Sequence, residues 1–157
     1  MNQDYINEEN NLFFKIYLQS WRIVNSFLFL NFLVPLSFYR GILLKLFGAR
    51  IGKNCVIKPN VKIYNPKNLF LGDNVWLGEN TDLYTLNKII IENNVVISQY
   101  VYLCTGSHDI KNNFKTVSGP ITIKKNSWIC TKCTILKDIV VPENSIIEAS
   151  TLLKNNK

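Results

Sequence analysis

The chain has 157 residues, of which 47% are hydrophobic and 12% aromatic, so it can form one folded domain and is not a disordered chain. Its formal net charge is +7, from 18 Lys and Arg against 11 Asp and Glu. This charge favours an anionic partner. Nucleic-acid binding has no other support in the sequence, and we set it aside.

The first ten residues, MNQDYINEEN, lack the basic segment that begins a secretory signal. We therefore expect a cytoplasmic protein whose four cysteines stay reduced. The longest stretch without a charge, residues 23–39, contains Pro35 and is slightly short for a transmembrane helix.

Residues 11–47 have the apolar spacing of helices, and Pro35 should divide them in two. The second helix is expected from Leu36 to Phe47, with Gly48 as its stop. The polar or amphipathic rim of the helices is expected to hold Trp21, Arg22, Tyr39, Arg40 and Lys45. Two interpretations remain open for residues 1–50: a helical cap on the end of the next unit, or an interfacial helix on an acidic membrane.

From Ile51 onward the periodicity changes, because aliphatic residues recur every six positions. The series is Ile51, Ile57, Ile63, Leu69, then Leu71, Leu77, Leu83, Ile89, then Ile91, Ile97, Leu103, and finally Ile123, Ile129, Ile135, Val141, Ile147 and Leu153. Six residues fit a short strand followed by a turn, with one inward aliphatic side chain per repeat. Three repeats close a coil of about 18 residues. The predicted fold class is therefore β: a single-stranded parallel β-helix of about five coils over residues 51–157.

Asparagines mark the expected corners of these coils. They are Asn54, Asn60, Asn74, Asn80, Asn94, Asn126 and Asn144. Asparagine tolerates left-handed backbone angles, so this pattern predicts tight turns between the strands.

One polar segment interrupts the repeat. Residues 103–120 read LCTGSHDIKNNFKTVSGP and include His108, the only histidine of the chain. We expect a loop over residues 104–120, extruded from the β-helix, and an excursion of this kind is where a solenoid usually carries its function.

Three segments resemble a known family: WR followed by YRGILLKLFGARIG, then NLFLGDNVWLGEN, then ISQYVYLCTGSHD. They resemble the hexapeptide-repeat acyltransferases, most closely the colanic-acid-type polysaccharide O-acetyltransferases and the maltose and galactoside acetyltransferases. The resemblance covers about residues 20–153. It implies a left-handed β-helix, a homotrimer with sites between subunits, acetyl-CoA as co-substrate and a saccharide acceptor.

Acetyl transfer from a thioester to a sugar hydroxyl requires a general base, and imidazole has a suitable pKa. We therefore expect His108 to be the base, oriented by Asp109 or by a backbone carbonyl. The resemblance assigns acceptor binding to Asn80, and Asp82 is a second candidate. Each of these two is about equally well explained as a turn residue.

The resemblance also implies a cofactor groove along the C-terminal coils. The expected cofactor-binding residues are Trp128, Thr131, Lys132, Ala149 and Lys154, with the two lysines near phosphates. The chain departs from the family pattern at Cys130, Lys154 and Asn155. Two alternatives therefore stay open: a non-catalytic trimeric scaffold, and an N-acetyltransferase acting on a nucleotide-linked amino sugar.

No metal is expected. Cys130 and Cys133 form a C-x-x-C motif, but the six-residue repeat turns the two side chains in different directions, and no second ligand pair exists. The predicted activity is acetyl-CoA-dependent O-acetylation of a bacterial surface polysaccharide or its precursor. Its location is the cytoplasm, with peripheral contact at the inner face of the membrane as an option.

Overall fold

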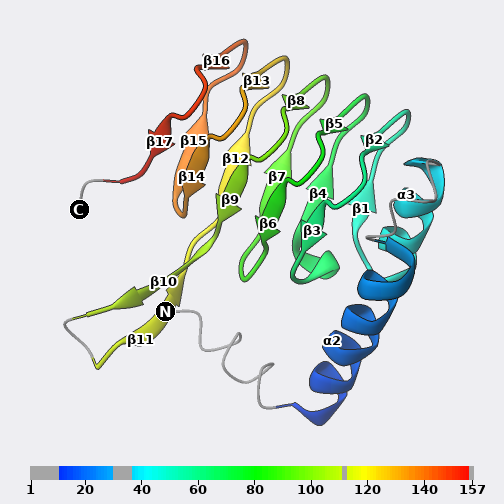
Figure 1. Ribbon diagram of the computed structural model, residues 1–157. Helices are drawn as coiled ribbons and strands as arrows, with labels where there is room; N and C mark the ends of the chain where they lie inside the picture. The colour runs from blue at the N-terminus through cyan, green and yellow to red at the C-terminus, as the bar shows by residue number, and fades with distance from the viewer. Residues whose placement is uncertain (1–10, 30–36, 111–112, 156–157) are drawn as a thin grey trace.

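The computed structural model of the protein describes residues 11–29, 37–110 and 113–155, and its main body is a parallel β-helix (Figure 1). Each face of the solenoid is a five-stranded parallel sheet. The first sheet contains β1 (Arg50–Ile51), β4 (Leu69–Leu71), β7 (Ile89–Ile91), β12 (Ile121–Ile123) and β15 (Ile139–Val141). The second contains β2 (Val56–Ile57), β5 (Trp76–Leu77), β8 (Val96–Ile97), β13 (Trp128–Ile129) and β16 (Ile146–Ile147). The third contains β3 (Lys62–Ile63), β6 (Asp82–Tyr84), β9 (Tyr102–Cys104), β14 (Thr134–Leu136) and β17 (Leu152–Leu153).

The expected coil of 18 residues is wrong for most of the solenoid. Leu69 pairs with Ile89, 20 positions later, and Ile121 pairs with Ile139, 18 positions later. The additional residues lie at the corner between the third and first sheets, where the short 3-10 helix Pro66–Asn68 also occurs. The six-residue repeat therefore holds along the strands, while this one corner varies in length.

The core is a stack of the predicted inward aliphatic residues. From Ile57 to Val141 every member of the series is at most 5% exposed, and Ile51, Ile147 and Leu153 at the two ends are partly buried. Each fully buried Leu or Ile side chain stabilises the fold by about 1.5–3 kcal/mol relative to an exposed one. The sequence prediction of the repeat is confirmed by this burial.

Asparagine corners are confirmed in the same way. All seven predicted asparagines have φ between +54° and +60°. Five of them form a ladder along one corner, in which each Nδ2 donates to the Oδ1 of the next residue at 2.9–3.3 Å: Asn54, Asn74, Asn94, Asn126 and Asn144. Most other residues adopt these backbone angles at a cost. The side-chain hydrogen bonds of the ladder further stabilise the corner.

Two helices lie at the end of the solenoid that carries β1, β2 and β3, opposite β16 and β17 (Figure 1). They are α2 (Leu12–Val24), followed by the π-helical turn Asn25–Phe29, and α3 (Ser37–Leu46), which packs on β1 and β2. Gly48 ends the second helix with a φ of +89°. The break expected at Pro35 lies outside the described residues. In the described part of the chain, no helix is long and apolar enough to cross a membrane.

The expected helical rim is wrong at two positions. Trp21 is 1% exposed, and its Nε1 donates to the carbonyl oxygen of Ile63 at 2.8 Å. Arg40 is fully buried, with its guanidinium group over the ring of Tyr39. Trp21 has a large apolar ring system that can be buried while its N–H is bound, and the aliphatic part of Arg40 can be buried in the same way.

The segment predicted as a loop is an antiparallel hairpin. It consists of β10 (Gly106–Asp109) and β11 (Lys115–Ser118) and projects from the corner that follows β9 (Figure 1).

Candidate active site

His108 lies on β10, directly opposite Thr116 of β11, and its side chain is exposed. The imidazole Nδ1 is 3.0 Å from the carbonyl oxygen of Phe114. A carbonyl can only accept, so Nδ1 carries the hydrogen and Nε2 carries the lone pair. We expected either Asp109 or a backbone carbonyl to orient His108, and the structure shows the hydrogen bond to a backbone carbonyl. Asp109 lies next to His108 on β10, where it pairs with Lys115.

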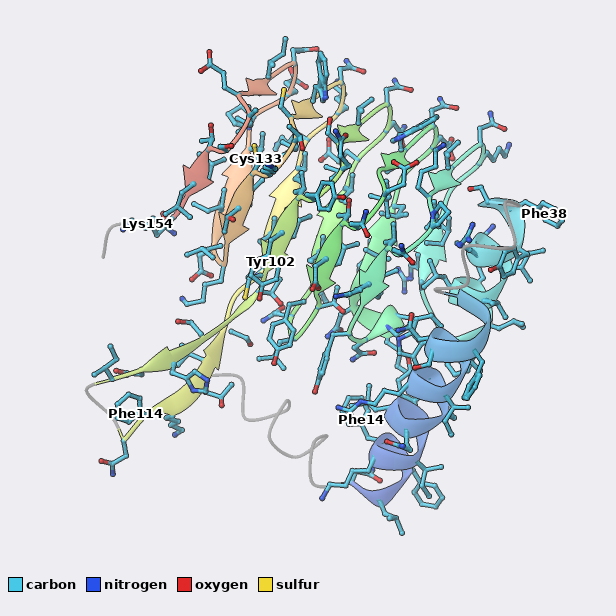
Figure 2. All side chains as sticks on the ribbon, viewed as in Figure 1. Phe14, Phe38, Tyr102, Phe114, Cys133 and Lys154 are labelled. Carbon is cyan, nitrogen blue, oxygen red and sulfur yellow. The ribbon has the colours of Figure 1, made fainter. Side chains whose placement is uncertain are left out.

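The carbonyl that holds His108 belongs to a strained residue. Asn113 and Phe114 both have φ of +53°, in the left-handed region. An asparagine adopts this region readily, whereas a phenylalanine is uncommon there, at a cost on the order of 1–2 kcal/mol. The Phe114 side chain is 67% exposed, so packing of its ring does not explain the strained backbone. Figure 2 shows Phe114 at the far end of the hairpin.

The root of the hairpin is fixed to the solenoid. The Gly119 amide donates to the carbonyl of Thr105 at 3.0 Å, and the Thr105 hydroxyl donates to the carbonyl of Tyr84 at 2.7 Å. A methyl group added to Gly106 would lie 2.8 Å from the Tyr84 ring. The chain therefore needs glycine where β10 leaves the solenoid, and the hairpin begins against the third sheet.

Asp82 lies on the outer face of that sheet, in register with Lys62 on β3 and Tyr102 on β9. Burial raises the pKa of the Asp82 carboxyl above its usual range, and the charge of Lys62 partly opposes this. Burial also raises the pKa of Tyr102, with further contributions from Cys104 and Asp82. The group is a partly dehydrated carboxylate between a cation and a phenol, which can donate and accept hydrogen bonds with a polyol.

Sequence reasoning missed the tyrosines on this face. Tyr64 and Tyr84 directly follow the inward residues of β3 and β6, and their ring centroids are 4.9 Å apart. Tyr102 precedes an inward residue and lies near the root of the hairpin (Figure 2). In a strand, successive side chains alternate between faces, so a tyrosine beside an inward aliphatic residue predicts an outward aromatic ring.

The expected cofactor residues Thr131, Lys132 and Ala149 follow one corner, between the second and third sheets. The Ser150 amide donates to the carbonyl of Thr131 at 3.0 Å, and the Thr131 hydroxyl donates to that of Gln99 at 2.9 Å. Asn80 lies at the same corner in an earlier coil, with φ of +58°, and Lys132 has φ of +59°. The structure thus aligns these residues along one edge of the solenoid.

Trp128 stands beside this edge, on the outer face of the second sheet, and is 48% exposed. Its Nε1 donates to the hydroxyl of Ser98 at 2.9 Å, which fixes the orientation of the ring. The indole therefore presents a positioned aromatic surface next to the corner.

Lys154 lies elsewhere, near the root of the hairpin. It lines a cavity of about 240 Å³ together with Gly106, Ser107, Leu136, Lys137, Asp138 and Asn155. A larger open cavity of about 390 Å³ lies over the first sheet and contains none of the predicted site residues.

Within one chain, the predicted residues therefore form two groups. His108, Asp109 and Lys154 belong to the hairpin side, and Thr131, Lys132 and Ala149 belong to the opposite corner. The outer face of the third sheet, with Asp82, lies between the groups. A strand of three residues is about 10 Å long, so this face separates the base from the cofactor edge.

The two cysteines of the C-x-x-C motif lie in different environments. Cys133 is fully buried in the core and Cys130 is half-buried, as their places in the repeat predict. Among the residues that the structure describes, no group of three or more His, Cys, Asp or Glu side chains could hold an ion.

Fold and site together define a β-helical protein with six-residue repeats and a histidine-bearing hairpin. No model of a known protein family matches the chain. It is similar to WcaF of Escherichia coli (strain K12), a protein named as a colanic acid biosynthesis acetyltransferase, with 41% identity over 135 residues, 85% of this chain and 74% of WcaF. This chain therefore belongs to the hexapeptide-repeat acetyltransferase family.

Solved structures agree with this assignment. A hexapeptide-repeat acetyltransferase from Vibrio cholerae, complexed with acetyl-coenzyme A, superposes with a TM-score of 0.82 over 92% of this chain and 80% of its own, at 15% identity. A galactoside acetyltransferase in complex with coenzyme A superposes with a TM-score of 0.66 over 74% of this chain and 62% of its own, at 25% identity. The expected left-handed β-helix fold is confirmed by these likenesses.

Proposed function

We propose that this protein transfers the acetyl group of acetyl-CoA to a sugar hydroxyl of a bacterial surface polysaccharide or its precursor. The observation that carries the proposal is the hydrogen bond between His108 Nδ1 and the Phe114 carbonyl oxygen. This bond orients an exposed imidazole on the projecting hairpin and makes Nε2 the basic nitrogen.

In the proposed mechanism, Nε2 of His108 accepts the proton of the acceptor hydroxyl as its oxygen attacks the thioester carbonyl. The new C–O bond gives a tetrahedral oxyanion, which backbone N–H groups near the groove stabilise. Collapse breaks the C–S bond, and the imidazolium returns its proton to the departing thiolate of CoA. The histidine is thereby neutral again after each turnover.

We place the acceptor on the outer face of the third sheet. The ring pair Tyr64 and Tyr84 offers a surface on which the apolar face of a pyranose can stack. Asp82 and Asn80 supply hydrogen-bonding groups nearby, and Asp109 lies on the hairpin next to the base. The hairpin root packs against Tyr84, so a sugar on this face would lie near the hairpin.

The co-substrate of this proposal is acetyl-CoA, which the Vibrio cholerae structure contains, and the galactoside acetyltransferase structure contains coenzyme A. Trp128 would form a wall of its groove, with Thr131, Lys132 and Ala149 along the adjacent corner. Lysine ammonium groups meet phosphates as point charges, which is the role proposed for Lys132 and Lys154.

The spacing of the two groups of residues supports sites shared between subunits, for which we propose the homotrimer that the family resemblance implies. One chain holds His108 and Thr131 on opposite sides of the third sheet, so one acetyl group cannot be near both residues of the same chain. Packing the hairpin of one subunit against the cofactor corner of the next would bring the two groups together. The apolar ladder Trp76, Val96, Trp128 and Ile146 on the second sheet supplies a surface for such packing.

The decisive experiment measures thiol release from acetyl-CoA with a panel of oligosaccharides, for the wild type and for His108→Ala. We expect activity to fall at least 100-fold in the variant, with the trimer intact, which is the typical contribution of general base catalysis. Activity that survives the substitution would place the base elsewhere. Absence of turnover together with no thermal shift by acetyl-CoA would support the scaffold alternative, because a bound ligand must stabilise the native state. Turnover only with amino sugars would support N-acetylation.

A further inference from the structure

Helix α2 has a second apolar stripe in addition to the one that faces the core. Its buried residues are Phe14 and Trp21, seven positions apart. Leu12, Ile16 and Ile23 lie within about 40° of one another around the helix and roughly opposite Trp21. All three are more than half exposed, and Phe13 and Phe27 near the same stripe are 79% and 73% exposed. A surface helix of a globular protein usually carries polar residues on the side that faces away from the core.

Helix α3 repeats this arrangement. Arg40 and Leu44 are its buried residues, and Phe38, Ile42 and Leu46 form an exposed stripe on the other side, at positions i, i+4 and i+8. Figure 2 shows Phe38 pointing away from the solenoid, whereas Phe14 lies on the side of α2 toward the solenoid. The end of the molecule that carries both helices is therefore covered by large apolar side chains.

The charged residues of this end that the structure describes are all basic. Residues 10–72 contain no Asp or Glu and nine basic residues, and the rest of the chain has nine Lys and Arg against 11 acids. The nine basic residues are Lys15, Arg22, Arg40, Lys45, Arg50, Lys53, Lys58, Lys62 and Lys67. Of these, Lys15, Arg22 and Lys45 are exposed on the two helices. The positive charge of the protein is thus concentrated in residues 10–72.

We propose that this end of the protein, with the exposed stripes of α2 and α3, docks on a membrane surface that contains anionic lipids. Apolar side chains would enter the boundary between headgroups and acyl chains, while the lysines and arginines contact the headgroups. A second copy of the chain fits this surface poorly, because two such ends would bring like charges together. A nucleic acid would use the charges but would leave eight aliphatic and aromatic side chains exposed. The docking surface does not depend on the chemistry proposed above, although it would bring the enzyme to a lipid-linked acceptor.

Flotation of the full chain with vesicles tests this directly, using phosphatidylcholine alone and phosphatidylcholine with about a third phosphatidylglycerol. We expect binding to the anionic vesicles and a strong decrease from about 0.1 M to about 1 M salt, where the Debye length falls from about 10 Å to about 3 Å. Retained binding to neutral vesicles at high salt, or no binding to either composition, would overturn the proposal.

Two sets of variants locate the surface. The pair Phe38→Ser and Ile42→Ser should lower the vesicle partition coefficient at least tenfold, and the triple reversal Lys15→Glu, Arg22→Glu, Lys45→Glu should lower it about 100-fold. Matched controls far from the helices are Val140→Ser with Leu152→Ser, and Lys88→Glu, Lys124→Glu, Lys125→Glu. Equal losses in the controls would overturn the assignment to the helical end.

If the surface of α2 and α3 binds something other than a membrane, these experiments give different results. If the Phe38 and Ile42 variant changes the number of subunits in solution, the surface is an interface between copies and the proposal is wrong. Binding of a soluble polyanion that is as tight as vesicle binding, and unchanged in this variant, would also contradict it.

Failure of the catalytic proposal is distinguishable, because His108→Ala should keep vesicle binding. The variant with Phe38→Ser and Ile42→Ser should keep acetyl transfer to soluble oligosaccharides, and its unchanged thermal unfolding would show that it folds.

Discussion

The imidazole of His108 and the carbonyl oxygen of Phe114 meet at 3.0 Å across the hairpin, six positions apart in the chain. The partner of the only histidine is thus a backbone atom whose place depends on a left-handed residue. This has a direct consequence for mutagenesis, because the backbone angle of Phe114 can be changed without touching the histidine.

Phe114→Val should lower the turnover number for acetyl transfer about tenfold or more, since a β-branched residue strongly disfavours a positive φ and the carbonyl would move. Phe114→Asn is the matched control, because asparagine accepts the left-handed angles and keeps the same carbonyl. Steady-state kinetics of thiol release would compare the two. Equal activity in both variants would mean that the carbonyl does not position His108.

Trp128→Ala should raise the KM for acetyl-CoA about tenfold with little change in the turnover number, if the indole forms a wall of the cofactor groove. Trp76→Ala provides the control. Trp76 lies on the same sheet two coils earlier and is 40% exposed against 48% for Trp128. The subunit number of both variants is measured alongside. A similar rise in KM for both would indicate a general effect on packing between subunits.

Asp82→Asn should raise the melting temperature at pH 7. Burial raises the pKa of Asp82 in the folded protein above its unfolded value of about 3.9, so the charged carboxylate costs stability above the folded pKa. That cost disappears as the pH falls through the folded pKa toward 3.9. The variant and wild type should therefore converge in thermal unfolding at acid pH.

Lys62 supplies the internal control for this pH dependence. Its charge lowers the pKa of Asp82. Lys62→Met should therefore raise that pKa further, destabilise the protein at pH 7 and widen the pH range over which acidification increases its stability. In the Asp82→Asn background the same change should have no effect on the pH dependence. If the stability difference between the wild type and Asp82→Asn grew as the pH fell, burial would not be the main cause of the shift in the pKa of Asp82.

Asn94→Ala should destabilise the protein by about 2 kcal/mol, through the left-handed backbone angle and the ladder bonds to Asn74 and Asn126. Asn94→Gly loses the same bonds but adopts the angle freely, and should cost about 1 kcal/mol less. Urea unfolding with a common slope measures both. Equal midpoints for the two variants would show that the ladder, and not the backbone angle, accounts for the stability.

The sequence predicts the strands well because each one depends on local signals. An aliphatic residue every six positions, such as Leu77, Leu83 and Ile97, determines which side chains point inward, and Asn74 or Asn94 marks the corner. The six-residue count continues from Ile63 to Leu69, but the residue in register with Ile51 is Leu71, two positions later. A strict repeat of 18 residues does not include these two positions, so it predicts too short a coil there.

Burial of the helices was harder to predict. Helical spacing groups Trp21 with Phe14, and Arg40 with Leu44, but two apolar stripes are present and the sequence does not say which one the solenoid covers. The site shows the same limit. His108 is recognisable from its uniqueness and its segment, whereas its hydrogen bond to Phe114 depends on a turn with two left-handed residues, and the tyrosine pair depends on stacking across coils.

The corner between the third and first sheets takes in residues 64–68, 85–88, 105–120 and 137–138 in successive coils. The strands on both sides stay in register whichever length the corner has. This corner is therefore a position where the chain can gain or lose a loop without a change in the core. The hairpin with His108 occupies the variable corner, and the proposed cofactor edge occupies a corner of constant length. Hairpin residues other than His108 could thus change between related enzymes, and with them the proposed acceptor contacts, without disturbing the corner that holds Thr131, Lys132 and Ala149.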